Sequence, residues 1–195
     1  GFGKSDVYAG AFPLEFIADE ATTFVPALLE GLGLKRFIAL GHSVGGGMIV
    51  NVAALCPGVV VALITEAAQA FPEDQTLKSI TEAKEQFRDV AQVARLAKYH
   101  GDKARWVLNA WTDTWLHPGF AIWSLEGVLP RVTCPTLVIH GEHDEYGSLR
   151  HPEMIGERSG GPAQVEIIAG AYHVPHREKP ELIVQMVADF VRDME

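Results

Sequence analysis

The sequence predicts an α/β fold built around a mostly parallel sheet with flanking helices. Short apolar segments alternate along the chain with longer segments of helical character. Parallel strands need helical crossovers between them, so this alternation favours a parallel sheet. The chain has 195 residues, 48% of them apolar, which is enough for one domain with a buried core. We expect the strands at 36–41, 59–64, 135–140 and 164–168.

Three segments that flank these strands have the pattern of helices. Residues 13–32 carry apolar side chains near the helical period, and we expect Pro26 to kink or break this helix. A second helix is expected over 44–55, where small residues dominate. The last helix, 180–194, has one apolar face of the kind that packs on a core.

The segment 70–126 is the exception, since it contains no run that resembles a strand. It is polar and helical from 74 to about 100 and then becomes aromatic. We therefore predict a helical insertion at 70–126, between two core segments at 1–69 and 127–195. All four tryptophans of the chain lie in the insertion, where they fit either an apolar substrate pocket or packing: Trp106, Trp111, Trp115 and Trp123.

Composition and charge exclude several classes of function. The chain has 16 Lys and Arg against 25 Asp and Glu, a formal net charge of −9, which argues against nucleic acid and anionic membranes as partners. No apolar run reaches the roughly 18 residues that a membrane span needs. The only cysteines, Cys56 and Cys134, are expected to be reduced and buried, as in a cytoplasmic protein.

The segment Gly41-His42-Ser43-Val44-Gly45 follows a predicted buried strand and opens a predicted helix. This is the context of the Gly-x-Ser-x-Gly nucleophile elbow, in which a strained turn lifts the serine above the sheet. We expect both glycines to be required because side chains there would collide with neighbouring elements. The backbone N–H of Val44 would stabilise an oxyanion beside Ser43.

A serine nucleophile needs a base that is oriented by a carboxylate. Glu142, Asp144 and Glu145 follow the third predicted strand, and His173 follows the fourth. Active-site loops lie at the carboxyl ends of parallel strands, so all four are candidates. The chain order Ser43, Asp144, His173 is the order that elbow-type hydrolases use.

The remaining histidines have weaker claims. His42 is expected to pack beneath the elbow or to hydrogen-bond locally, and we keep it with Trp111, Trp115 and Trp123 as a candidate for substrate contact. His140 and His143 have a His-x-x-His spacing, but they lie on a strand end with no cysteine nearby. We therefore predict no metal and no other cofactor.

Four motifs, taken together, resemble the α/β-hydrolase family over nearly the whole chain. Residues 1–6 resemble the loop after the family's fourth strand, and 41–45 resemble its nucleophile elbow. Residues 134–144 resemble the strand and turn that present the acid, which places that role on Asp144. Residues 170–176 resemble the loop of the base, which places that role on His173, and 70–126 corresponds to the family's helical cap.

The resemblance also implies strands that would precede Gly1, together with the loop that supplies a second oxyanion donor. We therefore expect the chain to be a fragment, a truncated product or one piece of a larger assembly. The 36–41 strand would then form an exposed apolar edge. A second copy of the chain or a preceding N-terminal portion is expected to cover that edge.

The predicted function is hydrolysis of a small ester with an apolar acyl or aryl group through an acyl-enzyme, as in a carboxylesterase. A carbon–carbon bond hydrolase of diketone-type substrates would use the same three residues, so it stays an alternative. A relative that only binds a ligand, or an inactive fragment, also stays open. The serine nucleophile argues against the family's dehalogenases and epoxide hydrolases, which resemble this fold but use aspartate.

Overall fold

The computed structural model describes residues 1–10 and 12–194 and divides them between two compact units. One unit combines Gly1–Phe16 with Pro72–Trp123, and the other combines Ile17–Phe71 with Ser124–Glu195. We call them the helical unit and the sheet unit. Ala11 and Glu195, which the sequence analysis assigned to the core segments, lie outside the described residues.

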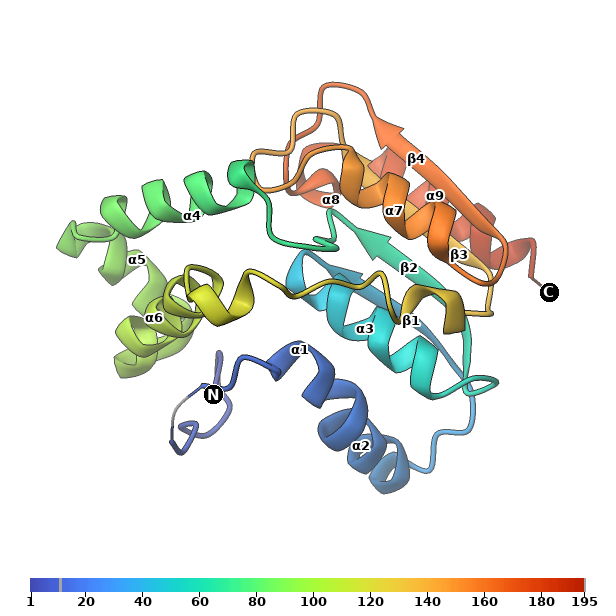
Figure 1. Cartoon of the computed structure of the whole chain (residues 1–195), viewed down its shortest axis with the longest axis horizontal. Coiled ribbons are helices and arrows are strands. Elements are labelled where there is room, and N and C mark those ends of the chain that lie inside the picture. Colours follow the sequence, from blue (N-terminus) through green and yellow to red (C-terminus); the bar gives the residue numbers. More distant parts are fainter. Residues whose placement is uncertain (11, 195) are drawn as a thin grey trace. The chain divides into compact units, whose positions relative to one another are not determined.

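The sheet unit contains four parallel strands, which confirms the predicted α/β fold (Figure 1). They lie in the order β1-β2-β3-β4, so neighbours in the sheet are also neighbours in the sequence. Because the strands are parallel, all of their carboxyl ends lie at one edge of the sheet, where loops can bring side chains together. The strands are β1 Phe37–His42, β2 Val60–Glu66, β3 Thr136–Gly141 and β4 Ala163–Ile168.

Helices pack against the strands of this unit. Helix α3 (Val44–Leu55) contacts β1 and β2, and α7 (Arg150–Arg158) contacts β3 and β4. Helix α9 (Pro180–Arg192) follows the short α8 (Pro175–Glu178), contributes Ile183 to a core cluster with residues of the strands, and packs further apolar side chains against that cluster. The cluster consists of Ile64, Leu137, Ile139, Ile168, Ala171 and Ile183. A 3₁₀ turn, Leu129–Arg131, precedes β3.

The predicted helix over 13–32 begins at Phe16 and consists of three contiguous pieces. These are α1 (Phe16–Asp19), a π-helical turn (Glu20–Phe24) and α2 (Val25–Leu32). The chain is not broken at Pro26, because Phe24 and Val25 keep right-handed helical angles; instead the helix type changes at Val25, which places the proline in the first turn of α2, where no N–H is needed. Gly33 ends α2 in the left-handed conformation (φ 64°), as expected for a helix C-cap.

In its second segment, Pro72–Trp123, the structure describes three main helices and two 3₁₀ turns of the helical unit. The polar segment predicted to be helical from 74 to about 100 forms two helices, α4 (Asp74–Gln86) and α5 (Val90–His100). Asp89 caps α5 by accepting a 2.9 Å hydrogen bond from the Ala91 N–H, and this cap marks the division. The rest of the unit comprises 3₁₀ turn Gly101–Lys103, helix α6 (Ala104–Trp115) and 3₁₀ turn Pro118–Phe120.

Aromatic side chains hold the helical unit together. Trp115, Phe120 and Trp123 form one cluster, with ring centroids 5.1 to 5.8 Å apart. Trp106 forms a second cluster with Phe2, Tyr8 and Phe12, so the first residues of the chain belong to this unit. No sequence pattern indicated that association.

Two further observations bear on the predictions from composition. Among the described residues, no helix combines the length and apolarity that a bilayer crossing requires. Cys56 and Cys134 are unpaired, as expected, but both are half-buried rather than buried. Partial burial raises the pKa of the Cys134 thiol, so that thiol stays in its neutral form.

Candidate active site

Ser43 occupies the tight turn between β1 and α3. Its backbone has φ 55° and ψ −127°, a conformation that side chains other than glycine rarely adopt and that stores strain of order 1–3 kcal/mol. A Cβ on Gly41 would lie 2.3 Å from the Gly45 carbonyl oxygen, so glycine is required there. The prediction for Gly45 is wrong, because a Cβ at that position would meet nothing within 4 Å. Besides Gly41, the close approach in this turn is at Gly46, where an added Cβ would lie 2.4 Å from the Cβ of Ala68.

The Ser43 hydroxyl does not cap its own helix. Serine is the N-cap residue of α3, yet its side chain makes no capping hydrogen bond. Oγ lies instead 2.9 Å from His173 Nε2 and 3.3 Å from Gln69 Oε1. The hydroxyl is thus directed to the loops that follow β2 and β4.

The imidazole of His173 bridges Ser43 and Asp144. Its Nδ1 lies 2.9 Å from both carboxylate oxygens of Asp144, while Nε2 faces Ser43. The three side chains therefore meet, although 29 and 130 positions separate His173 from its two partners in the sequence. Of the three carboxylates that competed for this place, only Asp144 reaches His173; Glu142 instead accepts the Gly170 N–H, and Glu145 is exposed.

The Asp144 carboxylate is buried, and its surroundings hold it in place. The Tyr146 N–H donates a 2.8 Å hydrogen bond to Oδ1, and Nε2 of the buried His140 lies 3.5 Å from Oδ2. The Tyr146 ring lies 4.8 Å from the His173 ring, and burial together with the neighbouring carboxylates raises the pKa of the Tyr146 phenol. The phenol therefore stays neutral beside the imidazole.

A second group of polar side chains lies next to this triad: His42, Glu66 and His176. The Glu66 carboxylate, 4% exposed, accepts hydrogen bonds of 2.7 Å from the His176 N–H and from its ring Nδ1. His42 Nε2 lies 2.7 Å from the His173 carbonyl oxygen, which assigns the proton to Nε2. Burial lowers the pKa of His42 below 6.5, so the ring is neutral near pH 7.

His42, Glu66 and His176 also have the residue types that hold a metal ion, with potential ligand atoms within 4.8 Å of one another. In this arrangement His42 Nε2 and His176 Nδ1 are both engaged in hydrogen bonds. The group is therefore satisfied as a hydrogen-bond network between the elbow, the end of β2 and the loop that carries His173.

The other predicted site residues have mixed outcomes. Val44 is the first residue of α3, where N–H groups have no intrahelical acceptor. Trp115 is 3% exposed and packs on aromatic neighbours, which fits the packing interpretation. Trp111 and Trp123 are half-buried, and their contact with a substrate stays a prediction. His42 hydrogen-bonds to the loop of His173, 131 positions along the chain, and not to a local partner as expected; its contact with a substrate stays a prediction.

Three polar residues of the site were not predicted from the sequence: Gln69, Glu66 and Glu178. Gln69 touches Ser43, and Glu178 accepts hydrogen bonds from the peptides on both sides of His173. Glu66 is the last residue of β2 and Gln69 follows it closely. Their position could have marked them as candidate site residues, because ligand sites of parallel sheets lie at the carboxyl ends of the strands. No local pattern marks Glu178.

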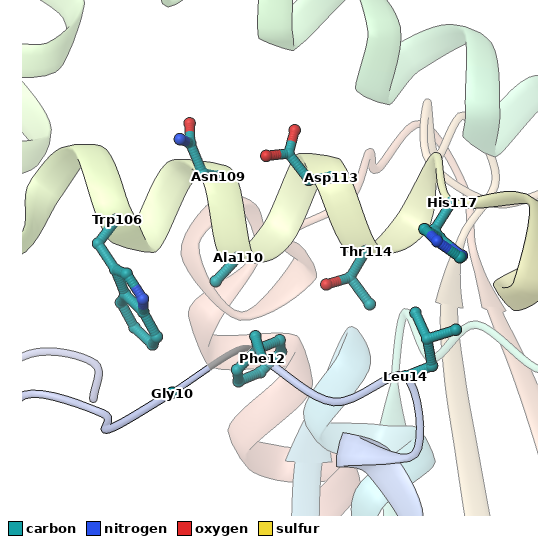
Figure 2. A pocket seen from close by; sticks show the side chains of 9 residues that line it. All are labelled: Gly10, Phe12, Leu14, Trp106, Asn109, Ala110, Asp113, Thr114 and His117. Carbon is teal, nitrogen blue, oxygen red and sulfur yellow. The ribbon is translucent and has the colours of Figure 1, made fainter.

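The helical unit has a cavity of its own, of about 280 Å³. Figure 2 shows that Trp106, Ala110 and Thr114 project from α6 toward Phe12 and Leu14 of the N-terminal segment. Asn109, Asp113 and His117 supply a polar part of the lining. The lining thus combines apolar and polar side chains.

Comparison with known proteins identifies the relatives of this chain. The model of the alpha/beta hydrolase family matches residues 1–186. Human serine hydrolase BPHL is 25% identical over 202 residues, covering 98% of this chain and 67% of that protein. Pimeloyl-(acyl-carrier protein) methyl ester esterase of Sodalis glossinidius is 28% identical over 214 residues, covering 97% of this chain and 79% of that protein.

A solved structure has the same fold. The 2-hydroxy-6-oxo-6-phenylhexa-2,4-dienoate hydrolase of Rhodococcus sp. strain RHA1 superposes with a TM-score of 0.75 at 15% identity, covering 98% of this chain and 76% of that one. The chain spans about two thirds of the length of the first curated relatives that it matches, from 64% to 67%.

Proposed function

Because this chain belongs to the alpha/beta hydrolase family, we propose that it hydrolyses small carboxylic esters through an acyl-enzyme on Ser43. The observation that carries the proposal is the His173 imidazole, which lies 2.9 Å from Ser43 Oγ on one side and 2.9 Å from Asp144 on the other. Relatives that are named as esterases support ester hydrolysis in general.

The proposed reaction follows from this arrangement. His173 Nε2 takes the hydroxyl proton as Ser43 Oγ attacks the ester carbonyl carbon. The oxygen of the tetrahedral intermediate accepts a hydrogen bond from the Val44 N–H at the start of α3. When the intermediate collapses, the C–O bond breaks, and the imidazolium of His173 gives its proton to the leaving alcohol.

The second half of the reaction uses the same groups. His173 removes a proton from water, which attacks the acyl carbon, and Ser43 leaves with that proton restored. Asp144 holds the His173 tautomer in which Nδ1 carries the proton, and its negative charge stabilises the imidazolium in both halves. These steps balance with water as the only co-reactant.

We further propose that the substrate has an apolar acyl or aryl group and that the helical unit acts as a cap that contributes to its binding. The support is the cavity lined in part by Trp106, Phe12 and Leu14, whose apolar side chains would bind such a group. We also propose that the protein is a hydrolase of the carboxylesterase type. The unpaired cysteines support a cytoplasmic location.

Labelling by a fluorophosphonate tests the proposal directly. Wild-type protein should form a covalent adduct at Ser43 and hydrolyse p-nitrophenyl acetate and butyrate. Ser43→Ala should do neither, while Ser159→Ala should behave as wild type, because that hydroxyl bonds to the Ile155 carbonyl away from the site. Folded protein that neither labels nor turns over any ester would contradict the proposal.

The same material separates the alternatives. Turnover of a diketone that exceeds turnover of the esters would indicate a carbon–carbon bond hydrolase. Saturable binding of an aryl ester without labelling or turnover would indicate a relative that only binds its ligand.

A further inference from the structure

The backbone around His173 is held by side chains rather than by regular secondary structure. Residues 169–174 form a loop between β4 and α8. The Glu178 carboxylate accepts the Tyr172 N–H at 2.8 Å through Oε2 and the Val174 N–H at 3.1 Å through Oε1. One side chain therefore holds the peptide groups on both sides of the imidazole.

The carbonyl of the same residue is also engaged. His42 Nε2 donates to the His173 carbonyl oxygen at 2.7 Å. This contact joins the residue before the nucleophile to the residue that activates it. Three hydrogen bonds with side chains thus hold the segment from 172 to 174, two of them to the single carboxylate of Glu178, and the Val174 carbonyl also accepts from the N–H groups of Arg177 and Glu178.

This support matters because of what the His173 ring has to do. Both ring nitrogens lie 2.9 Å from their partners, so the ring position is constrained on two sides. A loop without regular structure samples many backbone conformations unless its polar groups are tied. Hydrogen bonds that backbone N–H groups donate to a carboxylate are charge-assisted and therefore of the stronger kind, and they fix direction as well as distance.

We propose that Glu178 is a positioning residue that holds the His173 imidazole in line between Asp144 and Ser43. The inference rests on the proposed function for its kinetic consequences. Glu178 acts through the backbone and touches neither the substrate nor the reacting atoms. A misplacement of about 1 Å at a reacting group can lower the rate on the order of 100-fold.

The test compares Glu178→Ala and Glu178→Gln with wild type and with Glu181→Gln. The alanine variant loses both hydrogen bonds, and the glutamine variant keeps one acceptor oxygen while its NH₂ faces the other N–H. Glu181 is an exposed carboxylate at the start of α9, so its glutamine variant is a matched loss of charge. Circular dichroism establishes that each variant is folded.

For Glu178→Ala we expect kcat on p-nitrophenyl acetate to fall roughly 10- to 100-fold with little change in KM. The rate of fluorophosphonate labelling should fall in parallel. Glu178→Gln should lie between this variant and wild type, and it also serves if the alanine variant does not fold. Glu181→Gln should match wild type in both assays.

A proton NMR measurement gives a readout that needs no activity. The His173 Nδ1–H, held by Asp144, should give a downfield resonance in wild type that broadens or disappears in the Glu178 variants and persists in Glu181→Gln. If the Glu178 variants only melt earlier, with kcat, labelling and this resonance unchanged, Glu178 is structural and the inference is wrong. If wild type itself neither labels nor turns over esters, the proposed function fails, and the resonance alone decides the role of Glu178.

Discussion

His42 shows how one half-buried ring can make stability depend on pH. Burial is the largest cause that lowers its pKa, His173 and His176 add to the lowering, and Glu66 and the hydrogen bond to the His173 carbonyl oppose it. The unfolded chain therefore takes up a proton at His42 at a higher pH than the folded chain does. Its contribution to stability is present above the ordinary pKa of 6.5 and is lost as the pH falls below it.

We accordingly expect the free energy of unfolding to fall as the pH is lowered from about 7.5 to 5.5, and to fall less steeply in His42→Gln. The glutamine amide can still donate to the His173 carbonyl, but it does not titrate. Urea unfolding at a series of pH values measures both slopes. Equal slopes in the two proteins would show that His42 is not responsible.

The residues of the triad could be predicted from the sequence because each has a local marker. Ser43 lies in an elbow motif, and Asp144 and His173 directly follow apolar strands. Gln69 carries the same kind of marker, because it follows β2 as closely as Asp144 follows β3. Glu178 has none, and it is identified only once α8 turns its carboxylate back onto the loop before it.

At the scale of elements, the turn between β1 and α3 requires glycine only where an added Cβ would collide with neighbouring backbone. A Cβ on Gly41 would meet the Gly45 carbonyl oxygen at 2.3 Å, and neither backbone segment can move without shifting Ser43. We expect Gly41→Ala to cost at least about 1–3 kcal/mol of unfolding free energy, the usual range for overpacking. It should also slow fluorophosphonate labelling, because the serine would be displaced.

Gly45→Ala is the matched comparison, since a Cβ there meets nothing within 4 Å. Alanine is favoured over glycine inside a helix by about 1 kcal/mol, so this variant should be as stable as wild type or more stable. Urea unfolding of the two variants measures the difference. A similar loss of stability in both would mean that the motif glycines act through something other than steric contact.

The helices and strands, like the site residues, could be predicted where a local sequence pattern determines them and not where distant contacts do. Each of the four strands was predicted to within two residues at either end, although only β2 and β3 are buried along their length, while β1 and β4 are partly exposed. The helix over 13–32 was not predicted in its detail, because no sequence pattern distinguishes a π-helical turn at Glu20–Phe24 from an α-helical one. The association of residues 1–16 with the helical unit rests on aromatic contacts with Trp106, far along the chain.

At the scale of the whole molecule, β1 is an edge strand that presents apolar side chains. It pairs only with β2 among the described strands, and Ile38 and Leu40 are 38% and 56% exposed. These two residues are two positions apart and so lie on one face of the strand. An edge strand with exposed apolar residues is a surface on which a second chain can pair, and we expect a second copy of this chain to do so.

The net charge of −9 opposes this association, because two copies repel each other. Self-association measured by analytical ultracentrifugation should therefore increase with protein concentration and also with salt, which screens the repulsion beyond about 10 Å at 0.1 M. Leu40→Lys should reduce it, since a lysine on an edge strand disfavours pairing. Val184→Lys on α9, 67% exposed, makes the same change in net charge away from the edge and should leave association unchanged. If both lysine variants reduce association equally, the interface does not involve β1.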